Sequence, residues 1–156
     1  MIVVLALAIL GPEVLKPPKM PDIPFPWRLL DLRRANEMEI KSEYTNEGPN
    51  WVRLYGIDVP NTSEKGYSGA RQDLEILLGR NPDLYYEDEK EGHPISRNAE
   101  YVQYVWTRGQ LIEFEMVHNG WARVNEEGRK GRYGKYLVRA EEEAKRLHFG
   151  IWETMP

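Results

Sequence analysis

The sequence predicts an α+β fold, because a run of β-strand patterns in its first half is followed by segments with helical spacing. Between residues 27 and 57, aromatic and β-branched residues alternate with polar ones, which is typical of half-buried strands. Apolar residues then recur at helical intervals after Gly66 and again from Leu137 to Leu147. The chain has 156 residues, a length that suits one domain and a core that needs no disulfides.

The composition narrows the classes of function. The chain carries 21 Lys and Arg against 25 Asp and Glu, a net charge of −4, and it has no cysteine. Disulfides, thiolate metal sites and cysteine nucleophiles are therefore excluded. The acidic balance argues against a general nucleic-acid coat protein, whose affinity comes from clustered cations, but it does not exclude a local basic patch.

The N-terminal residues predict a segment outside the main domain. Residues 1–11 contain an unbroken apolar run that is too short for a stable membrane span, which takes about 20 apolar residues. The run resembles part of a secretion signal or anchor, and it also fits a buried strand. We favour a secreted or membrane-tethered location over the cytoplasm. Repeated prolines in residues 12–26 predict an extended linker, so the folded domain is expected to span residues 27–153.

The first part of that domain predicts three strands joined by short connections. Residues 27–33 form the first pattern, and Met38 and Ile40 alternate with charged residues in the second. A turn at residues 46–50 leads into the third strand, residues 51–57. These strands are expected to form a meander.

Helices and further strands follow. The apolar spacing after Ser68, with a stop at Gly79, predicts a helix. Residues 83–87 and 101–107 have strand patterns, whereas residues 110–119 fit a strand or a helix equally well. The amphipathic segment from Leu137 to Leu147 predicts a closing helix.

Several short motifs carry a resemblance to a known family. The motif Val-Arg-Leu-Tyr-Gly-Ile-Asp-Val-Pro spans residues 52–60, and a Leu-Leu-Gly helix end follows at residues 77–79. Residues 116–122 contain a Val-x-x-Gly-x-Ala helix end, and residues 140–152 end in Gly-Ile-Trp. In this order the motifs resemble the staphylococcal nuclease family over residues 27–153. The resemblance implies a five-stranded Greek-key barrel of the OB type with three helices, and it favours a helix at residues 110–119.

The resemblance also implies a catalytic site, which this sequence matches in part. The family site implies a calcium ion held by two aspartates and a backbone carbonyl, two arginines on the phosphate and a glutamate as base. Arg53 matches the first arginine, Asp58 matches the second aspartate, and Val59 can supply the carbonyl. The second arginine depends on the direction of counting: one count selects Arg97 and the other ends on Glu100.

The rest of the family site is altered. Asn61 stands at the position of the glutamate, and an amide cannot accept a proton at neutral pH. Met38 falls at the first aspartate, where a thioether is a poor ligand for calcium. Glu39 or Glu37 could replace it only if the strand register differs. The resemblance therefore implies a degenerate site with weak calcium binding at best.

A basic tract after the last strand motif is a candidate nucleic-acid surface. Such a tract can follow a phosphate backbone while its tyrosines stack on bases, or it can be a solvated Gly-rich connection. The acidic residues 87–91 fit a solvated surface or a contact for a basic protein partner. The candidate nucleic-acid-binding residues of the tract are Arg129, Lys130, Arg132, Tyr133, Lys135 and Tyr136.

Three functions follow from these observations. The first is a nuclease-like domain that binds nucleic acid or a nucleotide, preferably single-stranded, with weak or no phosphodiesterase activity. The second is an active calcium-type endonuclease or phosphodiesterase on DNA or RNA that uses Arg53, Asp58, Arg97 and Glu39 or Glu37. The third is a protein-interaction module.

Overall fold

A computed structural model describes residues 15–44, 49–89 and 100–153. The elements are β1 (Trp27–Arg34), β2 (Glu37–Ser42), β3 (Asn50–Leu54), β4 (Ile57–Asp58), α1 (Tyr67–Leu78), β5 (Asp83–Glu87), β6 (Glu100–Thr107), β7 (Gln110–Leu111), α2 (Ile112–His118), β8 (Arg123–Val124), α3 (Glu126–Lys130), α4 (Gly134–Leu147) and the 3-10 helix η1 (Gly150–Trp152).

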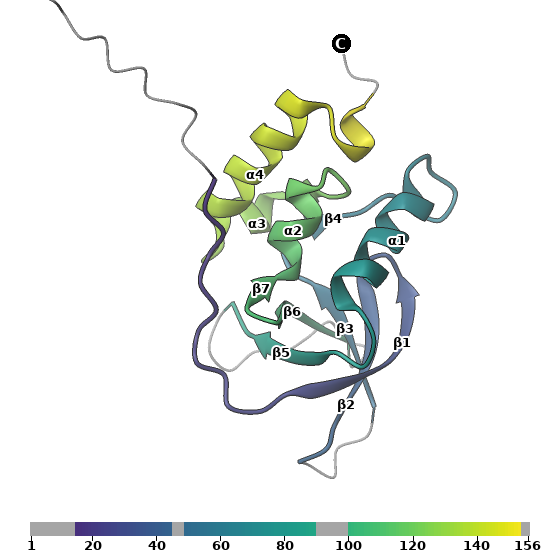
Figure 1. Ribbon diagram of the computed structural model, residues 1–156, viewed down its shortest axis with the longest axis vertical. Coiled ribbons are helices and arrows are strands. Elements are labelled where there is room, and N and C mark those ends of the chain that lie inside the picture. The colour runs from purple at the N-terminus through teal and green to yellow at the C-terminus, as the bar shows by residue number, and fades with distance from the viewer. Residues whose placement is uncertain (1–14, 45–48, 90–99, 154–156) are drawn as a thin grey trace, which may run out of the picture.

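The main strands close into a mixed five-stranded barrel, which confirms the predicted α+β fold. The sheet has the strand order β3-β2-β1-β5-β6-β7. A parallel pairing of β3 with β6 closes the first five strands into a ring, and the short β7 pairs with β6 outside it. Strands β4 and β8 form a separate two-stranded sheet. The three predicted helices correspond to α1, α2 and α4, which lie together at one end of the barrel (Figure 1). The short α3 and η1 are additions to the predicted set.

The core fills the barrel and the space beneath the helices. Met38 and Ile40 of β2 and Val52 and Leu54 of β3 point inward at every second position, as the alternation predicts. Residues 110–119 are mostly helical, because the strand β7 ends at Leu111 and α2 follows at once.

One carboxylate lies inside this core. Glu113 of α2 is 0 % exposed and accepts hydrogen bonds from the backbone N–H groups of Val105 (3.2 Å) and Tyr55 (3.3 Å). Desolvation by this burial raises the pKa of Glu113 from 4.5 to about 8, although the two N–H groups act in the opposite direction. Glu113 thus links α2 to β6 and to the end of β3.

The segment before β1 differs from the detached linker that its prolines predict. Residues 15–26, here called the N-terminal strap, have no regular secondary structure, but Pro18 is buried and Leu15, Met20 and Ile23 pack against the core. The strap runs from the end of the molecule that carries α4 to the end where β1 begins (Figure 1). Its apolar side chains alternate with the prolines, so an extended chain can still bury one side. Residues 1–14 lie outside the described ranges.

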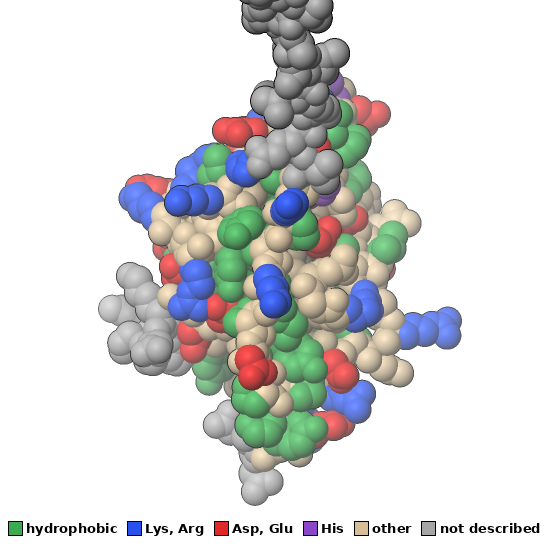
Figure 2. Space-filling view, turned by 60° about the vertical axis from the view of Figure 1, so that its left-hand side comes forward, with side chains coloured by type: hydrophobic (Ala, Val, Ile, Leu, Met, Phe, Trp, Pro, Cys, Tyr) green, Lys and Arg blue, Asp and Glu red, His purple; other side chains and the backbone are tan. Residues whose placement is uncertain are grey.

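The surface on the side of the strap has mixed character. Figure 2 turns this side forward and shows hydrophobic side chains gathered along the face, with Lys, Arg, Asp and Glu side chains scattered between them.

No helix within the described ranges combines the length and apolarity that crossing a bilayer requires.

Candidate functional site

A cavity of about 730 Å³ opens beside the ends of β2, β3 and β4. Its described lining is rich in charged residues of both signs, and we call it the arginine cavity. The basic residues in the lining are Arg34, Arg53 and Arg123, and the acidic ones are Glu37, Asp58 and Glu64.

Strand pairing brings the central residues of the cavity together. Arg53 on β3 lies opposite Glu37 on β2, and Asp58 on β4 lies opposite Arg123 on β8. The turn between β3 and β4 is only two residues long. It therefore keeps Arg53, before the turn, and Asp58, after it, on the same cavity.

Glycine is required in that turn. Gly56 has a φ of 74°, and a Cβ atom there would lie 2.5 Å from the Cα of Gly128 on α3. The backbones of the turn and of α3 therefore pack directly against each other, which fixes the direction in which Asp58 leaves the turn.

Each acidic side chain of the arginine cavity already has a partner within the protein. Glu37 accepts a hydrogen bond from Arg34 (3.4 Å), and Oδ1 of Asp58 accepts one from the Asn125 amide (3.2 Å). The carboxylate of Glu64 accepts from the backbone N–H of Asn61 (2.9 Å) and from its side-chain amide (3.3 Å). Within the described ranges, no group of three acidic or histidine side chains is arranged to hold a metal ion.

Four of the predicted site residues line the arginine cavity together. They are Arg53, Asp58, Val59 and Asn61. The amide of Asn61 serves as a donor toward Glu64, as a residue that cannot act as a base would. The predicted Arg97 lies outside the described residues.

The predicted register at β2 is wrong. Met38 is fully buried in the core, where its sulfur accepts from the Tyr86 hydroxyl (3.8 Å), so it does not stand at a ligand position. Glu39 does not line the arginine cavity and lies opposite Trp51. The hairpin before β2 ends at residue 36, which places Glu37 at the cavity, whereas Glu39 lies two residues and about 6.6 Å further along the strand.

The main cavity residue that sequence reasoning missed is Arg123. Its guanidinium lies over the ring of Trp152, 5.1 Å from the ring centroid, and Lys145 lies 4.6 Å from the same ring. The position of Arg123 opposite Asp58 depends on a two-residue strand, which leaves no periodic signal in the sequence. Glu64 was missed for a similar reason, because it belongs to a loop.

The basic tract is largely engaged with acidic residues of the protein. Arg129 pairs with Glu141 (2.9 Å), and Lys130 pairs with Glu126 on the same short helix. Neither residue of the tract lines the arginine cavity.

The next two residues of the tract contact β5 and the loop after it. The Arg132 guanidinium pairs with Glu87, and its backbone N–H donates to the carboxylate of Glu89 (2.9 Å). Tyr133 is 8 % exposed, donates to Glu87 (2.7 Å) and packs against Trp106 with a centroid distance of 5.4 Å. Its ring packs in the core and is therefore not available to stack on a base.

Lys135 and Tyr136 complete the tract and are exposed at the start of α4, with Tyr136 40 % exposed. The acidic residues 87–91 were predicted to form either a solvated surface or a contact for a basic protein partner. Two of them, Glu87 and Glu89, contact Arg132 of this chain.

Comparison with known proteins supports the family that the motifs indicate. The sequence model of the family described as staphylococcal nuclease homologue matches residues 51–154, about two thirds of the chain. This range contains the arginine cavity's Arg53, Asp58, Asn61 and Arg123. A search of curated proteins gave no match to this chain.

Proposed function

Because this chain belongs to the family of staphylococcal nuclease homologues, we propose that its arginine cavity binds a phosphodiester of a nucleic acid or nucleotide and cleaves it weakly or not at all. The observation that carries the proposal is the meeting of Arg53, Asp58 and Asn61 in one cavity. Arg53 stands where the resemblance implies a phosphate-binding arginine, and Asn61 stands where it implies the base, which supports binding with little or no cleavage.

Two arginines are proposed to hold the phosphate. Guanidinium groups suit phosphate because their N–H donors match two oxygens at once. Arg53 reaches the cavity from β3 and Arg123 from β8, so the two approach from different elements. Stacking on Trp152 limits the conformations of Arg123 and lowers the entropy lost when it binds. Arg34 also lines the cavity, where it pairs with Glu37 (3.4 Å).

The proposal of weak cleavage rests on the chemistry of the acidic groups. Loss of a general base alone typically lowers a rate by ~10²–10⁴. Calcium takes about six to eight oxygen ligands, whereas the carboxylates of Glu37, Asp58 and Glu64 each accept hydrogen bonds from protein groups. These residues do not fit a resident calcium ion, so we assign no step to calcium. Weak calcium binding remains a prediction.

A single strand is the preferred form of the ligand. Barrels of the OB type bind oligonucleotides on one face, where unpaired bases are accessible.

A binding assay with the full chain tests the proposal. Anisotropy of labelled single-stranded DNA and RNA gives the dissociation constant as a function of salt. Arg53→Ala and Arg123→Ala should each weaken binding and reduce the slope of log K against log salt by about 0.7. Arg146→Ala, which removes an exposed arginine from α4, is the matched control and should change neither value. Equal effects of all three variants would refute the cavity as the binding site.

A cleavage assay separates the alternatives. The second function, a calcium-dependent endonuclease, would require Glu37 and Glu64 to exchange their present hydrogen bonds for calcium beside Asp58. Cleavage that calcium supports, that a chelator stops and that Asp58→Ala abolishes would favour it. If the chain binds neither DNA nor RNA, the proposal fails and a protein-interaction module becomes the better hypothesis.

A further inference from the structure

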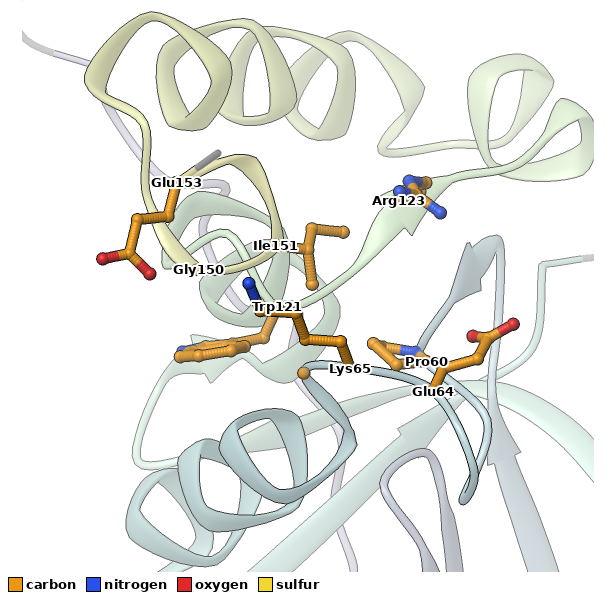
Figure 3. A pocket seen from close by; sticks show the side chains of 9 residues that line it. Pro60, Glu64, Lys65, Trp121, Arg123, Gly150, Ile151 and Glu153 are labelled. Carbon is orange, nitrogen blue, oxygen red and sulfur yellow. The ribbon is translucent and has the colours of Figure 1, made fainter. Parts of the chain in front are cut away.

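A second hollow of about 310 Å³ adjoins the arginine cavity. The two share Pro60, Glu64 and Arg123 in their linings, and these residues lie at one end of the hollow (Figure 3). Trp121 and Ile151 lie further along it, and Glu153 lies at the opposite end. A ligand that reaches Arg123 from the arginine cavity therefore meets the hollow next.

The wall that carries Trp121 and Ile151 is held by two glycines. The backbone N–H of Ile151 donates to the carbonyl of Gly120 (2.8 Å). Gly120 and Gly150 both have positive φ, and a Cβ atom on either would lie 2.3 Å from a backbone oxygen of the other segment. The segments before β8 and at η1 thus cross at backbone contact, which keeps the wall in place.

The floor of the hollow is open because another glycine lies there. A Cβ atom on Gly66 would lie 3.0 Å from Cγ2 of Ile151 and 3.5 Å from Cγ of Pro60, so a side chain would fill this space. The indole edge of Trp121 rests on Gly69 of α1, where a Cβ atom would lie 2.3 Å from the ring. This contact fixes the orientation of the ring, which remains half-buried.

The chemistry of the hollow suits a flat, uncharged group. Trp121, Ile151 and Pro60 offer aromatic and aliphatic surface. Among the charged residues of the described lining, Lys65 and Arg123 are balanced by Glu64 and Glu153, so the hollow does not attract a second phosphate. Its volume lies at the lower end of the ~300–1,000 Å³ typical of small-molecule sites.

We propose that this hollow is a subsite for the base of the nucleotide next to the phosphate bound in the arginine cavity. The base stacks on Trp121. Arg123, at the end that the hollow shares with the arginine cavity, contacts the phosphate bound in that cavity, which joins this nucleotide to the next one. The inference rests on the proposed function, because the phosphate must first bind at Arg53 and Arg123. The Gly-x-Ala motif of residues 120–122 leaves the middle residue open, and this chain places a tryptophan there.

The test compares two probes that differ only in their bases. Trithymidylate and an abasic analogue with the same phosphates are titrated against the full chain. The wild type should prefer trithymidylate by about 5- to 150-fold, which corresponds to ~1–3 kcal/mol per stacked base. Trp121→Leu should lose this preference and keep the affinity for the abasic probe. Trp51→Leu is the matched control, because Trp51 lines neither cavity, and it should keep the preference.

A second measurement covers the case in which Trp121→Leu does not fold. Stacking of thymine should quench the fluorescence of the wild type, and this quenching should be lost in Trp121→Phe, which keeps an aromatic ring at the same position.

The outcomes separate the two proposals. Equal binding of both probes by the wild type, or a preference and quenching that survive both Trp121 variants, would overturn the base subsite and leave the arginine cavity as the phosphate site. If neither probe binds, the proposed function fails, and the base subsite fails with it.

Discussion

The buried carboxylate of Glu113 predicts how the free energy of unfolding changes with pH, and the shift in its pKa sets the size of that change. The native state holds this group with a pKa of about 8, whereas the unfolded chain returns it to 4.5. Between these values the native state carries a proton that the unfolded state has released. The free energy of unfolding therefore falls as the pH rises from 4.5 to 8. Below pH 4.5 and above pH 8, Glu113 adds no further change with pH.

The size of the effect follows from the shift. Each unit of pKa difference corresponds to about 1.4 kcal/mol, so by pH 7 the wild type has lost roughly 3 kcal/mol of its unfolding free energy through Glu113. Glu113→Gln has nearly the same shape and does not titrate. The added amide N–H₂ group carries a cost that does not depend on pH. The informative quantity is thus the change with pH in the difference between variant and wild type.

Urea unfolding followed by tryptophan fluorescence measures this difference at pH 5, 6, 7, 8 and 9. Relative to the wild type, Glu113→Gln should gain stability by about 1 kcal/mol per unit between pH 5 and 8 and no more above that range. Glu142→Gln, at an exposed position of α4, is the control and should show a flat difference. A flat difference for Glu113→Gln as well would refute the reasoning, because it would mean that the buried group titrates as it does in water.

Two further predictions use the same unfolding assay. Met38→Leu should cost less than ~1.5 kcal/mol because it conserves volume, whereas Met38→Asp should unfold the domain and give no calcium affinity in a titration, since position 38 is a core position. Arg132→Ala should cost at most about 1 kcal/mol, because Glu87 loses its ion pair with a half-exposed guanidinium but keeps the Tyr133 hydroxyl and the Trp106 indole N–H as donors. The variant keeps the backbone N–H that donates to Glu89, and it should leave the affinity for single-stranded DNA within about twofold of the wild type. Strongly weakened DNA binding would instead return the basic tract to the nucleic-acid surface.

The strands β2 and β3 could be predicted because they obey a two-residue period that burial enforces, whereas their closure into a barrel was implied only by the family resemblance. Met38 and Ile40 were expected to share one face, and they do. Arg53 and Asp58 line the same cavity, because both lie on the short stretch of chain that forms the motif from Val52 to Pro60.

The remaining site residues depend on where segments meet, which local patterns do not encode. The motif comparison set Met38 at the cavity, but the hairpin ends at residue 36, which shifts the register by one residue and brings Glu37 there. Arg123 comes from a strand too short to show a period. Tyr133 looked like a stacking residue because a Gly-rich tract suggests exposure, and only the tertiary contact with Glu87 reveals that its hydroxyl and ring are used inside the protein.

The packed strap also determines how the domain responds to mechanical load. Tension that arrives from the N-terminal side acts first on Leu15, Met20 and Ile23, whose apolar contacts give way one after another as in peeling. The β1–β2 ladder lies behind them and begins with Trp27 of β1 opposite Ser42 of β2. The apolar contacts of the strap should therefore open before the pairing of β1 with β2 is disturbed.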